Sequence, residues 1–155
     1  MHLQQVTWQA RQRRTVLAIA PQGDLIMIDD LYQKGDKIRR EVLGDAHVTR
    51  SLANTDPFAK TIQDYVTRIG WGEVWGREGL DRRSRSILNL GMLAALGKDH
   101  EMKIHIKGAL RNGLTRDEIA EIFLQVALYC GAPAALECFR LAREVFEDVD
   151  TNGMD

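Results

Sequence analysis

One histidine of this 155-residue sequence is placed where it could carry a proton inside an apolar environment. His105 has Met102 three residues before it and Ala109 four residues after it, so the three side chains share one face of an expected helix. The imidazole pKa of about 6.5 lies close to neutral pH, which suits histidine to proton transfer. The alternative is a core histidine hydrogen-bonded to a backbone carbonyl, and position alone favours that alternative.

Three arginines precede the most apolar segment of the chain, at positions Arg82, Arg83 and Arg85. A guanidinium is planar and permanently charged, and it can bind a carboxylate through two parallel hydrogen bonds. Cations are disfavoured at a helix N-terminus, so their place in a first turn indicates a purpose other than helix stability. We expect Arg85, which is nearest the apolar segment, to act on a reacting anion and Arg82 to bind it. Ion pairs with neighbouring acids are the alternative.

A second basic pair, Arg39 and Arg40, lies in the first expected helix. Either side chain could reach a carboxylate of a ligand, even across a subunit boundary. The alternative is a surface ion pair with Glu41 or Asp36, which are close in sequence.

Two tryptophans four residues apart, Trp71 and Trp75, flank Glu73 and have glycines beside them. Two indoles at this spacing could form the wall of a site for a flat, ring-shaped ligand and exclude water from it. They could equally anchor a core or an interface. Glu73, between them, is a candidate for a second proton-handling group.

Apolar residues recur at helical spacing along most of the chain. Caps at Asp56, Asp81 and Asp99, a capping box over residues 115–118 and glycine stops bound the pattern. It predicts helices over residues 28–43, 57–69, 82–96, 100–111, 116–130 and about 134–149. The segment 87–96 is apolar nearly all round, so we expect it to be buried in the domain or between subunits. One all-α domain of about six helices follows. His47 falls in an expected loop after the first helix, and a surface position is expected for it.

Composition excludes several classes of function. Twenty-one basic and 22 acidic residues give a net charge of −1, so no electrostatic argument favours nucleic acid or an anionic membrane. No apolar run is long enough to cross a bilayer. Cys130 and Cys138 have neither CxxC nor zinc-site spacing, which favours a reducing compartment, the cytoplasm. We expect residues 1–26 to be a flexible extension, 27–150 the folded domain and 151–155 a tail.

Five segments in order resemble the carboxymuconolactone decarboxylase family, and the resemblance covers roughly residues 28–148. They are residues 39–44, 71–75, 80–86, 105–113 and 125–135. The resemblance implies an alkylhydroperoxidase D-like helical bundle that assembles through apolar helices into a trimer or hexamer. It also implies a cofactor-free carboxy-lyase that converts 4-carboxymuconolactone to the β-ketoadipate enol-lactone, in the protocatechuate branch of aromatic catabolism.

With the resemblance, a catalytic role for His105 is at least as well supported as the role of a core histidine. We expect Arg85 and Glu73 to act with His105. Arg39, Arg40, Arg82, Trp71 and Trp75 are the expected substrate contacts. Peroxidases of the wider superfamily carry CxxCxxxH. Aligned on His105, their thiol positions hold Lys98 and Glu101, so the disulfide cycle cannot run here. A non-catalytic helical binding or assembly module is the remaining alternative.

Overall fold

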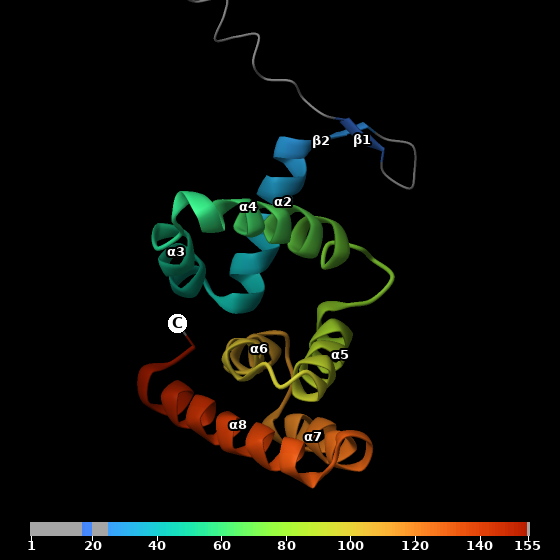
Figure 1. Cartoon of the computed structure of the whole chain (residues 1–155), viewed down its shortest axis with the longest axis vertical. Helices are drawn as coiled ribbons and strands as arrows, with labels where there is room; N and C mark the ends of the chain where they lie inside the picture. The colour runs from blue at the N-terminus through green and yellow to red at the C-terminus, as the bar shows by residue number, and fades with distance from the viewer. Residues whose placement is uncertain (1–16, 20–24, 155) are drawn as a thin grey trace, which may run out of the picture.

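The structure, a computed structural model, describes residues 17–19 and 25–154. Its elements in chain order are β1 (Leu17–Ile19), β2 (Leu25–Met27), α2 (Ile28–Leu43), α3 (Asp45–Ala53), α4 (Pro57–Tyr65), the π-helix η1 (Val66–Val74), α5 (Arg82–Ala95), α6 (Asp99–Arg111), α7 (Arg116–Cys130) and α8 (Ala132–Asn152). The prediction of an all-α domain is confirmed, because every element after Met27 is helical (Figure 1). No helix of the described part is long and apolar enough to cross a membrane.

The predicted N-terminal extension falls mostly outside the described residues. Its described parts, β1 and β2, pair as a short antiparallel ribbon with Leu17 opposite Met27. Helix α2 starts at Ile28, directly after β2.

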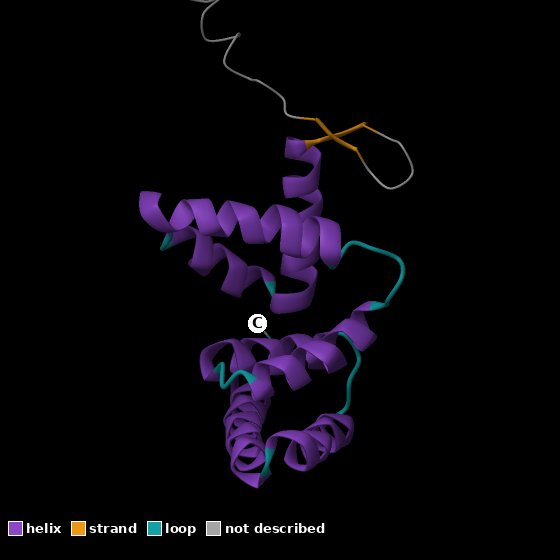
Figure 2. Ribbon diagram, turned by 45° about the vertical axis from the view of Figure 1, so that its right-hand side comes forward, coloured by secondary structure: helices purple, strands orange, loops and turns teal. Residues whose placement is uncertain are grey.

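The helices form two groups joined by one loop (Figure 2). The first group contains α2, α3, α4 and η1, and the second contains α5 to α8. Each group has its own apolar cluster. The smaller cluster contains Ile38, Val42, Leu43, Val48 and Trp71. The larger one includes fully buried Leu90, Ile106 and Phe123. Since α6 also packs on α2, the two groups meet along these two helices.

Helix α2 and η1 touch backbone to backbone. A Cβ added at Gly35 would lie 1.9 Å from the carbonyl oxygen of Thr67, and one at Gly72 would lie 2.4 Å from that of Leu31. No other residue type fits at either position without moving a backbone. The helix that we predicted to stop at residue 69 instead continues, with a hydrogen bond from the Trp75 amide to the Gly70 carbonyl, five residues back.

Helix starts follow the predicted caps. Asp81 accepts a hydrogen bond from the Ser84 amide at the start of α5. Thr115 and Glu118 form the reciprocal capping box predicted for α7. The cap predicted at Asp99 is wrong by one residue, because Asp99 is already the first residue of α6.

Two predictions about local structure were wrong. His47 lies on α3 and is half-buried, whereas a loop and a surface position were expected. Helix α8 runs to Asn152, beyond the predicted helix end near residue 149. The reason for the first error is the chain reversal at Gly44, which has a φ of 95°, so a second helix starts at once where a loop was expected.

Helix α5 is buried within the chain on one face only. Leu90 and Ala94 belong to the core, but Leu88 and Met92 are more than half exposed. We expected this apolar helix to be buried in the domain or between subunits. The core of the domain covers only one of its faces.

Candidate active site

Three of the predicted site residues lie together although they come from two elements. The indole of Trp71 lies 4.8 Å from that of Trp75, centroid to centroid. The imidazole of His105, on α6, stacks against both indoles, with centroid distances of 6.1 and 6.3 Å. The aromatic cluster of Trp71, Trp75 and His105 therefore joins η1 to α6, the junction of the two helix groups.

Burial controls the charge of His105 in this cluster. Removal from water lowers the pKa of its imidazole to about 4, the carboxylate of Glu101 opposes this change, and His47 adds to it. At neutral pH the imidazole is uncharged. It can accept a proton or donate one N–H hydrogen bond, but it does not carry a proton ready for delivery.

Arg39 is buried, and its two terminal guanidinium nitrogens bond neutral groups, whereas its Nε has no hydrogen-bond partner among the described residues. Its guanidinium donates to Gln63 Oε1 at 2.9 Å, to Ser51 Oγ at 3.2 Å and to Thr67 Oγ1 at 3.4 Å. Only 6% of the residue is exposed, and burial lowers its pKa. The surface ion pair considered as the alternative for Arg39 is therefore wrong, since the side chain fastens α2 to α3, α4 and η1.

Arg40 and Arg82 each meet a carboxylate. Arg40 bonds Asp36 at 2.8 Å and Asp45 at 2.7 Å, and Arg82 pairs with Glu41 on α2. The structure therefore shows Arg40 and Arg82 in ion pairs, as the alternative interpretation expected.

Arg85 and Glu73 lie apart from these pairs. The Arg85 guanidinium donates to the carbonyls of Leu80 and Arg77, each at 3.1 Å, and so holds the loop before α5. Glu73 is exposed on η1. Within the described chain, neither side chain makes a recorded hydrogen bond to the aromatic cluster, and their catalytic roles remain predictions.

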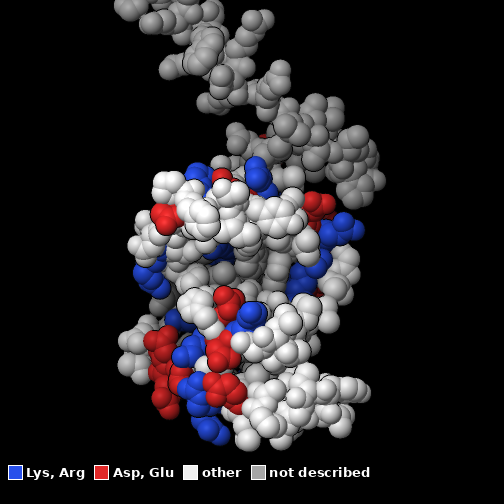
Figure 3. All heavy atoms as spheres, viewed as in Figure 1, with Lys and Arg blue, Asp and Glu red and all other residues white. Residues whose placement is uncertain are grey.

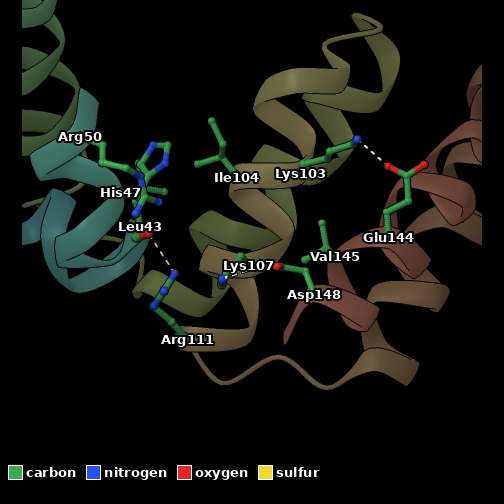
Figure 4. Close-up of a pocket in the computed structure, with 10 residues that line it drawn as sticks. All are labelled: Leu43, His47, Arg50, Lys103, Ile104, Lys107, Arg111, Glu144, Val145 and Asp148. Carbon is green, nitrogen blue, oxygen red and sulfur yellow. Dashed lines mark hydrogen bonds and ion pairs between the residues drawn. The ribbon is translucent and has the colours of Figure 1, made fainter. Parts of the chain in front are cut away.

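A cavity of about 310 Å³ lies on another face of α6, between α3 and α8 (Figure 4). Cationic side chains line it, namely Arg50, Lys103, Lys107 and Arg111, with the half-buried imidazole of His47. Two carboxylates, those of Glu144 and Asp148, also line it. The floor is apolar, with Leu43, Ile104 and Val145. This volume is within the range of small-molecule sites, roughly 300–1,000 Å³.

Contacts between helices hold Lys103, Lys107 and Arg111 in this cavity. Lys103 pairs with Glu144, and Lys107 pairs with Asp148 at 3.2 Å, so the lysines link α6 to α8. Arg111 donates to the Leu43 carbonyl at 2.9 Å. Its guanidinium lies over Gly44, where a Cβ would approach Arg111 Nη2 to 2.6 Å.

Sequence reasoning missed this cavity. Lys103, Lys107 and Arg111 recur every four residues, which is the pattern of an ordinary solvated helix face. Their partner acids are about 40 residues away on α8, and His47 was expected in a loop. The four-residue spacing of three cations was the available signal, but it did not indicate which element would face them.

The thiols do not form a redox pair of the peroxidase kind. Lys98 and Glu101, at the positions of the peroxidase thiols, are both exposed. Cys138 is buried, and burial raises the pKa of its thiol to about 11, so it stays protonated. Cys130, the last residue of α7, is exposed. Among the residues that the structure describes, no three His, Cys, Asp or Glu side chains are grouped closely enough to hold a metal ion.

Comparison with known proteins agrees with the sequence motifs. The model of the carboxymuconolactone decarboxylase family matches residues 60–144. A 4-carboxymuconolactone decarboxylase of Acinetobacter baylyi is 42% identical over 118 residues, which cover 76% of this chain and 88% of that protein. A nitrosuccinic acid decarboxylase of Metarhizium robertsii is 38% identical over 123 residues, 79% of this chain and 86% of that protein. The chain therefore belongs to the carboxymuconolactone decarboxylase family.

Proposed function

We propose that this chain is a carboxy-lyase that converts 4-carboxymuconolactone to the β-ketoadipate enol-lactone without a cofactor, in the protocatechuate branch of aromatic catabolism. The observation that carries the proposal is the 42% identity to the Acinetobacter baylyi decarboxylase across 88% of its length. The alkylhydroperoxidase alternative lacks both thiols of its motif, because Lys98 and Glu101 stand in their places.

The reaction sets three requirements. The bond to the departing carboxylate breaks, carbon dioxide leaves, and the electron pair passes through the unsaturated ring to the lactone carbonyl oxygen. A proton must then reach a ring carbon. The enzyme has to bind a dianion, stabilise the new oxyanion and supply that proton. Each well-aimed donor at an oxyanion lowers the barrier by about 2.7–4 kcal/mol.

Side chains suited to these tasks lie around α6. The aromatic cluster provides a neutral imidazole, which can donate a hydrogen bond to an oxyanion, and two flat apolar rings. The neighbouring cavity provides an excess of cations. Arg85 and Glu73 remain predicted catalytic residues to be tested by substitution. The Arg85 hydrogen bond to the Leu80 carbonyl lies at the surface, and Glu73 is exposed.

Nitrosuccinic acid is a second candidate substrate, because the Metarhizium robertsii relative, at 38% identity, is a nitrosuccinic acid decarboxylase. Loss of carbon dioxide beside a nitro group also leaves an electron pair that spreads onto oxygen. The same three requirements therefore apply to both acids.

We also propose that the chain acts as a homo-oligomer in the cytoplasm. Large apolar side chains are exposed on several helices, among them Leu88 and Met92 on α5, Leu128 and Tyr129 on α7, and Phe58 on α4. An apolar groove of about 730 Å³ runs between α5 and α7. Charged residues are scarce over the exposed end of α7 in Figure 3. A second copy of the chain would remove this surface from water.

The test is turnover by the purified protein. Freshly generated 4-carboxymuconolactone and nitrosuccinic acid are supplied separately, and carbon dioxide release is measured with and without a chelator. We expect release well above the spontaneous rate with the lactone, unchanged by the chelator. Release from nitrosuccinic acid alone would reassign the substrate, and release from neither would contradict the proposal.

A further inference from the structure

We propose that the cavity between α3, α6 and α8 is the dicarboxylate site of this enzyme, in which Arg50 binds a carboxylate and His47 delivers the proton. This inference rests on the proposed function, and it moves proton delivery from His105 to a second histidine. The carrying observation is that His47 and Arg50 face the same cation-lined cavity from α3 (Figure 4).

The charge of the cavity matches the charge of the substrate. Its lining holds four cationic side chains and two carboxylates, so two positive charges are in excess, and the proposed substrate carries two negative charges. Cations focused in a partly enclosed site attract an anion more strongly than cations spread over a surface. The apolar floor of Leu43, Ile104 and Val145 offers a face for the lactone ring.

Arg50 is the cation best placed to recognise a ligand. Lys103 and Lys107 are already paired with Glu144 and Asp148. Arg50, in contrast, makes no hydrogen bond or ion pair with the other residues drawn around the cavity (Figure 4). Its planar guanidinium can bind a carboxylate through two parallel hydrogen bonds.

His47 is three residues before Arg50 on the same helix, so their side chains share a face. Burial lowers the pKa of His47, and nearby Arg39, Arg50, His100 and Arg111 lower it further. The acids of the cavity, Glu144 and Asp148, lie on the opposite wall and are paired with lysines. A bound dianion would favour the charged imidazole and so raise its pKa towards neutral pH. The substrate thus brings the proton donor into its acid form.

The step balances as follows. The carbon–carbon bond to the departing carboxylate breaks, carbon dioxide leaves, and the electron pair moves to the lactone oxygen as an enolate. The His47 imidazolium gives its proton to the ring carbon next to the lactone carbonyl, and the carbonyl double bond re-forms. The product leaves with one negative charge, and His47 regains a proton from water. His105, neutral in its stack with Trp71, supports α6 from its other side.

Arg50→Gln and Arg143→Gln form a matched pair that tests binding. Arg143 is exposed on α8 and does not line the cavity. We expect Arg50→Gln to raise KM for the lactone roughly 10- to 100-fold, because the charge-assisted bonding of the carboxylate is lost, and Arg143→Gln to leave KM unchanged. Calorimetry should show weaker binding of muconate, an unreactive dicarboxylate, to Arg50→Gln and unchanged binding to Arg143→Gln. Equal KM values and equal muconate affinities in both variants would overturn the assignment of the cavity.

His47→Gln and His105→Gln separate the two histidines. Glutamine keeps a hydrogen-bond donor but cannot transfer a proton, so His47→Gln should lower kcat roughly 10²- to 10⁴-fold. The fall in wild-type kcat at high pH, where the imidazolium is lost, should disappear in this variant and persist in His105→Gln. The reverse pattern would return proton delivery to His105.

The measurement of muconate binding distinguishes a failure of this proposal from a failure of the proposed function. If the wild type turns over neither acid but binds muconate in an Arg50-dependent manner, the cavity stands and the reaction is wrong. If the wild type turns over the lactone with Arg50 and His47 dispensable, the reaction stands and the cavity is wrong.

Discussion

The imidazole of His105 lies nearly parallel to the indole of Trp71, with an angle of 10° between the rings and 6.1 Å between their centroids. The two residues are 34 positions apart in the sequence and belong to different helix groups. Their contact closes the junction between η1 and α6 and shields much of the half-buried imidazole from water, which lowers its pKa.

This stack makes the stability of the fold depend on pH. The folded pKa of His105, about 4, lies below the unfolded value of about 6.5, so the unfolded chain binds the proton more readily. The stabilisation is complete above about pH 6.5 and is lost as the pH falls towards 4. Between about pH 6.5 and 5 we expect the free energy of unfolding to drop by about 2 kcal/mol on this account. Urea denaturation at each pH measures it.

The control for this effect is His105→Gln, which removes the titrating group. Its free energy of unfolding should vary less with pH over the same interval. His47→Gln isolates the contribution of the second histidine, whose pKa is also lowered. Parallel curves for the wild type and His105→Gln would contradict the neutral state of His105 in the fold.

Arg39→Lys should weaken the fold more than it weakens substrate binding. The guanidinium of Arg39 serves Gln63, Ser51 and Thr67 together, and an ammonium group cannot reach all three. We expect the free energy of unfolding to fall by about 1–3 kcal/mol, with KM little changed. Stability equal to the wild type with a strongly raised KM would restore Arg39 to the role of substrate ligand that the sequence suggested.

Gly72→Ala should separate α2 from η1. The added methyl group would lie 2.4 Å from the Leu31 carbonyl oxygen, which cannot move without its helix. Gly70→Ala, in the same π-helix, meets only a Val66 methyl at 3.7 Å and is the matched control. Overpacking typically costs about 1–3 kcal/mol, so thermal denaturation should show a lower Tm for Gly72→Ala than for Gly70→Ala. Equal Tm values would show that the two backbones are not in contact.

Leu128→Lys should disrupt assembly. Leu128 is 74% exposed on α7, where burial between copies would make a lysine unfavourable. Thr151→Lys adds the same charge at an exposed position near the end of α8. Sedimentation equilibrium should give a lower mass for Leu128→Lys alone. A wild type that sediments as a monomer would contradict the proposed assembly.

Much of the fold followed from local signals. The caps at Asp81 and Thr115 lie where the sequence placed them, because a short polar side chain before an apolar run satisfies the first free amides of a helix. The family assignment is confirmed by the match of residues 60–144. Helix α3 was missed because its nine residues include few apolar ones, and its one fully buried side chain, Val48, gives no periodicity by itself.

The candidate site was only partly predictable. Trp71, Trp75 and His105 were each singled out, yet only the packing of η1 on α6 shows that they touch. Arg85 and Glu73 looked equally suitable for a catalytic role in the sequence. The contacts that a side chain makes, however, depend on which helices face it in the fold. The cavity was invisible for the same reason, since its two walls come from residues 43–50 and 103–148.

The π-helix between Val66 and Val74 has a consequence for how sequences of this family can change in length. Each hydrogen-bonded loop of a π-helix spans one residue more than that of an α-helix. Deleting one residue there could restore ordinary α-helical bonding, but it would rotate everything that follows by about 100° relative to what precedes. Trp75 would then turn away from His105, while substitutions at exposed positions such as Glu73 and Val74 would leave the register intact. Gene lineages should therefore tolerate altered letters in this stretch far more readily than gains or losses of a codon.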